Sequence, residues 1–158
     1  PFMHEYEHTQ PGTFMRAMTG LWVVIFVVGS VVMLALGGQE VAGAVIPGIV
    51  MLAVFTAIIV ALFHSLTVRI SRSDIAISFG VGLIRKRFSI GDIRSVRIAR
   101  NRWYNGWGIR KIRGGWLYNV SGFDAIEIQL KNERKYRIGT DQPKKLLAAV
   151  ESALAELS

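Results

Sequence analysis

Two long apolar runs in the first half of the chain constrain the fold more than any other sequence feature. Residues 21–38 and 41–63 contain no charged side chain. A helix needs roughly 20 apolar residues to cross the hydrocarbon layer of a bilayer. The second run meets this length, and the first does so once residues 17–20 are included. We therefore predict two transmembrane helices, at about residues 17–38 and 41–63.

Two other interpretations of these runs are weaker. Two buried core helices would need protein on every side, and residues 66–158 are too few to surround them. The first run also resembles a secretory signal peptide, with small residues at 35–37 as a cleavage site. Because the chain retains this run, we expect an uncleaved anchor.

The short link between the runs predicts a tight hairpin. Residues 38–40 are too few to form a domain, and none of them is Lys or Arg. By contrast, Arg69, Arg72 and the basic residues 85–87 follow the second run. Since Lys and Arg favour the cytoplasmic side, we place both termini in the cytoplasm. The predicted parts are a cytoplasmic N-terminal tail (1–16), a transmembrane hairpin (17–64) and a cytoplasmic domain (65–158).

A stripe of small residues runs along the second helix. Ala53, Ala57 and Ala61 recur every four residues and therefore share one helix face. Small side chains let helix backbones approach closely in lipid. The stripe is either a helix-packing surface or ordinary alanine usage, and the packing surface is the prediction.

After residue 65 the hydrophobic pattern changes to alternation. Leu66, Val68 and Ile70 share one face of an extended segment, and later segments repeat this period between Asp, Gly and Lys-Asn turns. The pattern predicts six or seven short antiparallel strands with one wet face. A final amphipathic helix begins after Thr140 or Asp141 as its cap and closes the open end of this small sheet or barrel. Its apolar stripe consists of Leu146, Leu147, Val150, Leu154 and Leu157.

The order of these segments, from LTVRISRSDIAISFG through GWGIR and GWLYNVSGFDAIEIQLKNERKYRIGT to the last helix, resembles the bacterial pleckstrin-homology-like (PH-like) domains. The resemblance covers residues 66–157 and the preceding hairpin, and it is most specific over residues 106–140. It implies a PH-like barrel that binds or scaffolds, without catalytic residues, and a place in a bacterial inner membrane. The first hairpin turn, SRSD, holds Arg72 alone, so the usual phosphoinositide site of PH domains does not carry over.

Positive charge is concentrated in the second part of the chain. The formal net charge is +8, and twelve basic residues lie between Arg69 and Arg113 with only Asp74 and Asp92 among them. A basic block of this size indicates an anionic neighbour, either nucleic acid or a lipid surface.

Residues 100–123 combine cations, tryptophans and glycines without an acidic residue. Nucleic acid is the weakest partner, because a short connection ties the segment to the membrane and no nucleic-acid fold pattern is present. Anionic lipid headgroups suit the cations, a protein partner suits Trp, Tyr and Arg, and a purely structural role remains open. We predict that residues 116–120 build the fold. The predicted lipid- or partner-binding residues are Arg100, Arg102, Trp103, Trp107, Arg110, Lys111 and Arg113.

No residue set indicates catalysis, a metal or a cofactor. The chain has no cysteine, which excludes disulfides and thiol chemistry. His4 and His8 match the zinc pattern H-E-x-x-H, but Pro11 follows almost at once and His64 ends a predicted membrane helix. We therefore expect a polar tail without zinc.

The acidic residues of the later strands are expected to be structural. Asp124 and Glu127 are predicted to be surface partners of Arg134 and Arg137 across a hairpin, and the hydrophobic parity beside them suggests a β-bulge.

These features predict a non-catalytic integral membrane accessory or scaffolding subunit. It would bind partner subunits of a respiratory, photosynthetic or transport complex, and neither nucleic acid nor a small-molecule substrate. The alternative is a free-standing module that senses anionic lipid headgroups.

Overall fold

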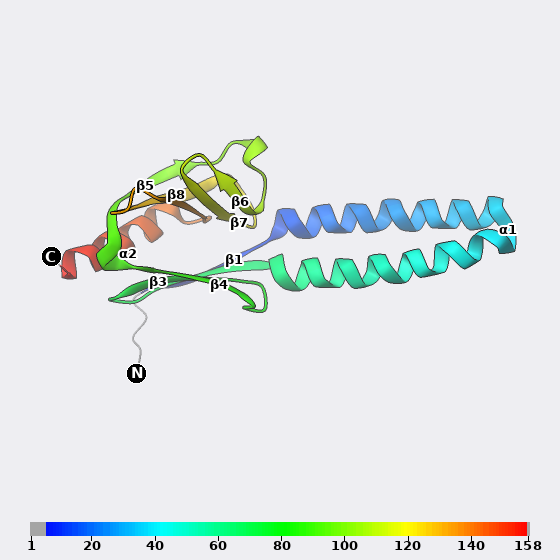
Figure 1. Ribbon diagram of the computed structural model, residues 1–158, viewed down its shortest axis with the longest axis horizontal. Coiled ribbons are helices and arrows are strands. Elements are labelled where there is room, and N and C mark those ends of the chain that lie inside the picture. The colour runs from blue at the N-terminus through cyan, green and yellow to red at the C-terminus, as the bar shows by residue number, and fades with distance from the viewer. Residues whose placement is uncertain (1–5, 158) are drawn as a thin grey trace.

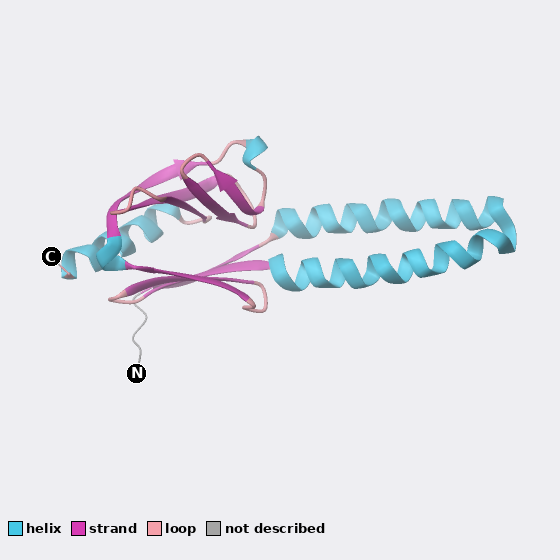
Figure 2. Cartoon of the chain, viewed as in Figure 1, coloured by secondary structure: helices cyan, strands magenta, loops and turns pink. Residues whose placement is uncertain are grey.

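The computed structural model describes residues 6–157 and combines a long helical hairpin with two β-sheets (Figures 1 and 2). The elements are β1 (Tyr6–Pro11), α1 (Thr13–Phe63), β2 (Ser65–Ile70), β3 (Asp74–Phe79), β4 (Ile84–Ser89), η1 (Ile90–Asp92), β5 (Ile93–Arg100), η2 (Trp103–Asn105), β6 (Gly108–Ile112), β7 (Gly115–Asn119), β8 (Asp124–Leu130), β9 (Lys135–Gly139) and α2 (Pro143–Glu156).

Helix α1 doubles back on itself and forms two apolar arms, Thr13–Gly37 and Gln39–Phe63 (Figure 1). The reversal needs glycine, because a Cβ on Gly37 would lie 2.1 Å from Cγ2 of Val41. Both arms are long and apolar enough to cross a membrane, and at most 6% of either apolar window is buried within the protein. The prediction of two long apolar helices is confirmed, with the first beginning at Thr13 rather than at residue 17.

The two arms contact each other along one face of each. Side chains that are at least partly buried recur every three to seven positions and include Met15, Thr19, Val23, Ser30 and Leu34 on the first arm, and Val41, Val45, Leu52, Thr56 and Ile59 on the second. The predicted alanine stripe lies off this contact, since Ala53 and Ala57 are exposed and only Ala61 is partly buried. Gly48 takes the packing role instead, with the Phe26 ring beside it.

The strands form two sheets rather than one closed barrel. Sheet A has the order β1-β2-β3-β4, and sheet B has the order β5-β8-β9-β7-β6. The antiparallel prediction is confirmed for every pair but one. Strands β7 and β9 are parallel, because β9 inserts between β7 and β8 instead of following a meander. The bulge interrupts β5 between Ile93 and Ser95, not the start of β8.

The N-terminal segment is a strand where a solvated tail was predicted. Strand β1 pairs antiparallel with β2, from Tyr6 opposite Ile70 to Pro11 opposite Ser65. Its side chains are mostly polar, so hydrophobic alternation could not identify it. Strand β1 is held instead by backbone pairing with the otherwise open edge of β2. Residues 1–5, including His4 of the zinc-like pattern, lie outside the described residues.

The core lies between the two sheets and is closed by α2 at the end farthest from the hairpin (Figure 1). Helix α2 packs mainly on β5 and β8 and also reaches β2. Of its predicted stripe, Leu146 and Val150 are fully buried, whereas Leu157 is exposed. The predicted cap at Thr140 or Asp141 is wrong: Gln142 occupies the N-cap position without a side-chain cap bond, and the Thr140 hydroxyl accepts from its backbone N–H at 3.0 Å.

The base of the hairpin is fused to sheet A by backbone contacts. The N–H of Gly12 donates to the carbonyl of His64 at 2.7 Å, and the N–H of Val81 donates to the carbonyl of Ala61 at 3.0 Å. Gly80 sits at this junction with φ +48°, and a Cβ there would lie 2.0 Å from the Ala61 carbonyl oxygen. The junction therefore tolerates only glycine at residue 80.

We expect Gly80→Ala to lower the free energy of unfolding by about 1–3 kcal/mol through backbone strain alone, with the clash against Ala61 adding to it. Denaturation in detergent, followed by tryptophan fluorescence, measures the change. Gly91→Ala is the matched control, because the nearest atom to its Cβ is a side-chain oxygen at 3.7 Å. Equal stability of the two variants would contradict the fused junction.

Candidate functional site

A broad groove on sheet B gathers most of the predicted binding residues. Its volume is about 840 Å³, and it is lined by the end of strand β5, the β5–β6 connection, strand β6, the β6–β7 turn and strand β9. The lining residues are Arg100, Arg102, Tyr104, Asn105, Gly106, Arg110, Lys111, Ile112, Arg113 and Arg137. Six of them are cationic and none is acidic, so this basic groove favours an anionic ligand.

Arg137 is the groove residue that sequence reasoning missed. Leu117 of β7 is opposite Arg110 of β6 on one side and opposite Arg137 of β9 on the other. Arg137 and Arg110 therefore lie on the same face of sheet B. This neighbourhood depends on the parallel pairing of β7 with β9. The alternation of polar and apolar residues along 135–139 predicts that Arg137 faces the polar side of its strand. It does not predict that β7 is the strand beside it.

Trp103 lies beside the basic groove rather than among its lining residues. Its side chain is 76% exposed and makes an edge-on contact with the Tyr104 ring. Arg102 also contacts Tyr104: one guanidinium N–H donates to the phenol oxygen at 2.8 Å, and the guanidinium carbon lies 5.7 Å from the ring centroid. Trp103 is therefore free to contact lipid or another protein.

Trp107, predicted to touch a partner, packs instead against the helical hairpin. Its ring stacks on Phe14 at the start of α1, with centroids 3.5 Å apart, and lies 5.9 Å from Phe123. The flanking Gly106 and Gly108 have φ of +71° and +88°, which lets the backbone turn Trp107 toward the helix. Trp107 thus fastens the β5–β6 connection to the first arm.

The prediction that residues 116–120 build the fold holds for most of them. Leu117 and Val120 are fully buried and Tyr118 nearly so. Trp116 is 42% exposed and does not fill the core. Its partner across the β6–β7 hairpin is Lys111, which is also exposed.

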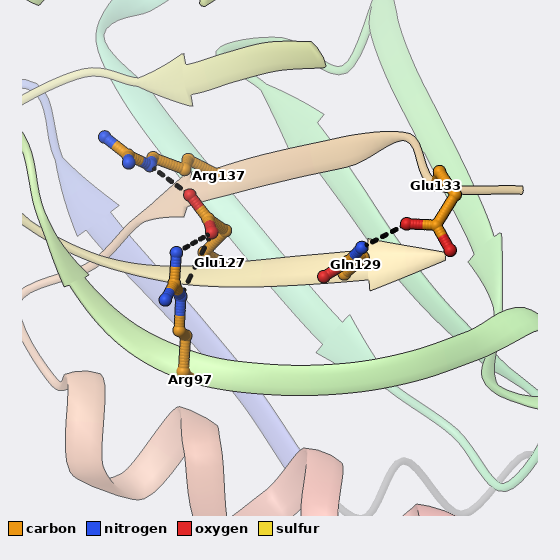
Figure 3. A network of polar contacts seen from close by, with 5 residues as sticks. All are labelled: Arg97, Glu127, Gln129, Glu133 and Arg137. Carbon is orange, nitrogen blue, oxygen red and sulfur yellow. Dashed lines mark hydrogen bonds and ion pairs between the residues drawn. The ribbon is translucent and has the colours of Figure 1, made fainter. Parts of the chain in front are cut away.

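A buried carboxylate organises the cations next to the basic groove (Figure 3). Glu127 of β8 is only 4% exposed and accepts hydrogen bonds from Nε of Arg97 at 3.0 Å and Nε of Arg137 at 2.7 Å. Burial alone would raise the pKa of the Glu127 carboxyl, but the hydrogen bonds from Arg137 and Arg97 outweigh it and hold that pKa below its ordinary value.

The predicted pairing of Glu127 with Arg137 is confirmed, although Glu127 is buried rather than on the surface. Arg97 from β5 is the second partner that the hairpin reasoning missed. Asp124 and Arg134 do not pair across the hairpin, because the register sets Ala125 opposite Gly139 and leaves Arg134 at the far turn.

Among residues 6–157, no group of three His, Cys, Asp or Glu side chains is arranged to hold a metal ion. His8, from the zinc-like pattern, instead lies with Nε2 2.5 Å from a carboxylate oxygen of Asp141. This contact joins β1 to the turn before α2.

No protein-family model matches the chain, and no curated protein or solved structure matches it either. The resemblance to PH-like domains therefore stays a prediction. Two layered sheets with a C-terminal helix are what the structure shows. The function has to follow from the geometry of the chain itself.

We expect Glu127→Gln to lower the free energy of unfolding by about 2 kcal/mol at neutral pH, because two guanidinium groups lose a charged acceptor. Since the folded-state pKa of Glu127 lies below the unfolded value, its contribution is present above the unfolded pKa and is lost as the pH falls through the folded pKa. Denaturation at neutral and acidic pH should show the two proteins converging in acid.

Glu133→Gln serves as the matched control for this prediction. Glu133 is exposed and pairs with Arg94, so its loss should change stability by less than about 1 kcal/mol. Equal effects of the two substitutions at neutral pH would contradict a special role for the buried carboxylate.

Proposed function

We propose that this protein is a non-catalytic accessory subunit of a bacterial inner-membrane complex. Helix α1 crosses the membrane as a hairpin, and the two sheets lie on the cytoplasmic face. The basic groove binds an acidic segment of a partner subunit. The observation that carries the proposal is the groove itself, with six cations and no acid in its lining, on a β-module fused to two apolar helices.

The distribution of exposed side chains and charge supports the membrane placement. The arms expose a nearly continuous apolar surface that includes Leu21, Val31, Leu36, Met51 and Phe55. The hairpin turn carries Glu40 and no cation, whereas eighteen basic residues follow residue 65. The turn without a cation and the basic residues after residue 65 agree with the positive-inside rule when the sheets are cytoplasmic.

The extent of the basic groove favours a protein ligand over a lipid headgroup. Gly108, at the start of β6, lies beside Phe63 at the end of the second arm. Arg113 follows the far end of the same strand, about 15 Å further along the chain. A headgroup remains at the bilayer surface and reaches only the end near Gly106, whereas an acidic peptide segment can follow the groove along its length.

The PH-like resemblance supports a binding role in general terms. The two layered sheets and the closing helix α2 agree with it, while the parallel β7–β9 pair and the added strand β1 depart from the expected antiparallel meander. The alternative function, sensing of anionic lipid, is supported by exposed Trp103 beside cationic Arg102.

We expect the double substitution Arg110→Glu/Arg113→Glu to weaken partner binding at the basic groove. The change replaces attraction by repulsion, so affinity for an acidic segment should fall at least tenfold. A photo-crosslinking residue in place of Tyr104, in native membranes, captures the partner, and mass spectrometry of the crosslinked peptide should find an Asp- or Glu-rich segment. The synthetic segment is then titrated against the full chain in neutral-lipid nanodiscs.

Lys144→Glu/Lys145→Glu is the matched control. It makes the same charge change on exposed positions of α2, away from the groove, and should leave binding intact. Crosslinks to anionic lipid alone, lost in Arg110→Glu/Arg113→Glu, would establish lipid sensing instead. Crosslinks that survive the groove substitution would overturn both functions.

A further inference from the structure

The turn between β3 and β4, residues 80–83, projects beside the base of the second arm. The N–H of Val81 donates to the carbonyl of Ala61, and the N–H of Gly80 donates to that of Ser65 at 2.9 Å. Ala61 lies within the apolar arm, two residues before its end at Phe63. The turn therefore begins at the level of the last helical turn of the arm, not out in the cytoplasm.

The tip of this turn carries two exposed apolar side chains. Leu83 is 78% exposed and Val81 is 61% exposed, and Leu83 is the most exposed large apolar side chain outside α1 in the described part of the chain. Neither side chain belongs to the core between the sheets. Both side chains are thus available for contact outside the molecule, at the level of the last helical turn of the arm.

One cation lies at the apolar tip, and two more lie farther along the outer face of sheet A. The Nε of Arg85 donates to the Gly82 carbonyl at 2.5 Å, which holds its guanidinium over the turn. Arg69 and Arg87 line a hollow with Arg85 on the outer face of sheet A, and Arg69 pairs there with Glu7 at 2.9 Å. An apolar tip bordered by Arg85 matches the interfacial layer of an anionic bilayer, where apolar groups enter the acyl boundary and cations contact headgroups.

The turn is held in one conformation before it meets any surface. The N–H of Gly82 donates to the Phe79 carbonyl at 2.7 Å, and φ is +48° at Gly80 and +84° at Gly82. Little conformational entropy remains to be lost on contact. In Figure 1 this turn and η2 lie on opposite sides of the base of the hairpin, both at the end of the sheets that faces the helices.

We propose that the β3–β4 turn is a membrane-contact element, in which Val81 and Leu83 enter the interfacial layer of the inner leaflet and Arg85 binds anionic headgroups. The inference rests on the proposed membrane placement of α1 and is independent of the basic groove. A membrane contact at this turn, beside the second arm, restrains the tilt of the sheets on the membrane surface. That tilt sets the direction in which the basic groove opens.

Site-directed labelling tests the proposal, and the absence of cysteine makes every introduced thiol unique. Leu83→Cys in the full chain is labelled with an environment-sensitive fluorophore and reconstituted into vesicles of phosphatidylcholine and phosphatidylglycerol. Ser73→Cys, in the exposed β2–β3 turn at the opposite end of β3, reports cytoplasmic exposure. Val54→Cys, on the exposed face of the second arm, reports insertion of the hairpin.

We expect the label at residue 83 to emit at shorter wavelength than the label at residue 73. It should also be several-fold less quenched by aqueous iodide and be quenched by a spin label near the lipid headgroup. Iodide quenching at residue 83 equal to that at residue 73, with residue 54 protected, would overturn this proposal alone. Iodide quenching at residue 54 would overturn the membrane placement of α1 as well.

Discussion

The pairing of β1 with β2 is the interaction on which the rest of the structure depends. The first arm of α1 begins directly after β1, and the second arm leads directly into β2, so one antiparallel ladder joins the two ends of the hairpin. Paired strands lie about 4.8 Å apart, whereas packed helices need about 8–10 Å. Gly12 accommodates the divergence, because its Cα is so close to the Phe63 carbonyl that a Cβ would lie 2.5 Å from that oxygen.

Sheet B is attached to the same base by side chains rather than by a ladder. The Thr13 and Ser121 hydroxyls are 2.8 Å apart, the Gln10 amide donates to the Ser121 carbonyl at 3.0 Å, and Trp107 stacks on Phe14. Both sheets are therefore positioned by the base of the hairpin, where the first arm begins and the second arm ends. Any surface of the β-module, including the basic groove, keeps a fixed relation to the hairpin.

Elements that produce a hydrophobic pattern along the chain could be predicted from the sequence. The apolar arms, most strands, α2 and the clustering of cations from Arg100 to Arg113 could be predicted because each depends on composition or spacing along the chain. Strand β1, Arg137 and Trp107 could not. Their roles come from backbone pairing of a polar edge strand, from a parallel crossover, and from two glycines that redirect a side chain toward Phe14. These are tertiary relations that no local pattern encodes.

The basic groove stores unfavourable electrostatic free energy that an anionic ligand relieves. Of its six cations, Arg137 is compensated by the buried Glu127, but Glu127 is shared with Arg97 and does not line the groove. The remaining cations repel one another across a hollow open to solvent, where salt screens them beyond about 10 Å. A ligand that binds only the folded chain adds to its stability in proportion to the logarithm of ligand concentration. Binding of the proposed acidic segment would therefore stabilise the folded β-module, and salt would weaken that binding because it screens the groove cations.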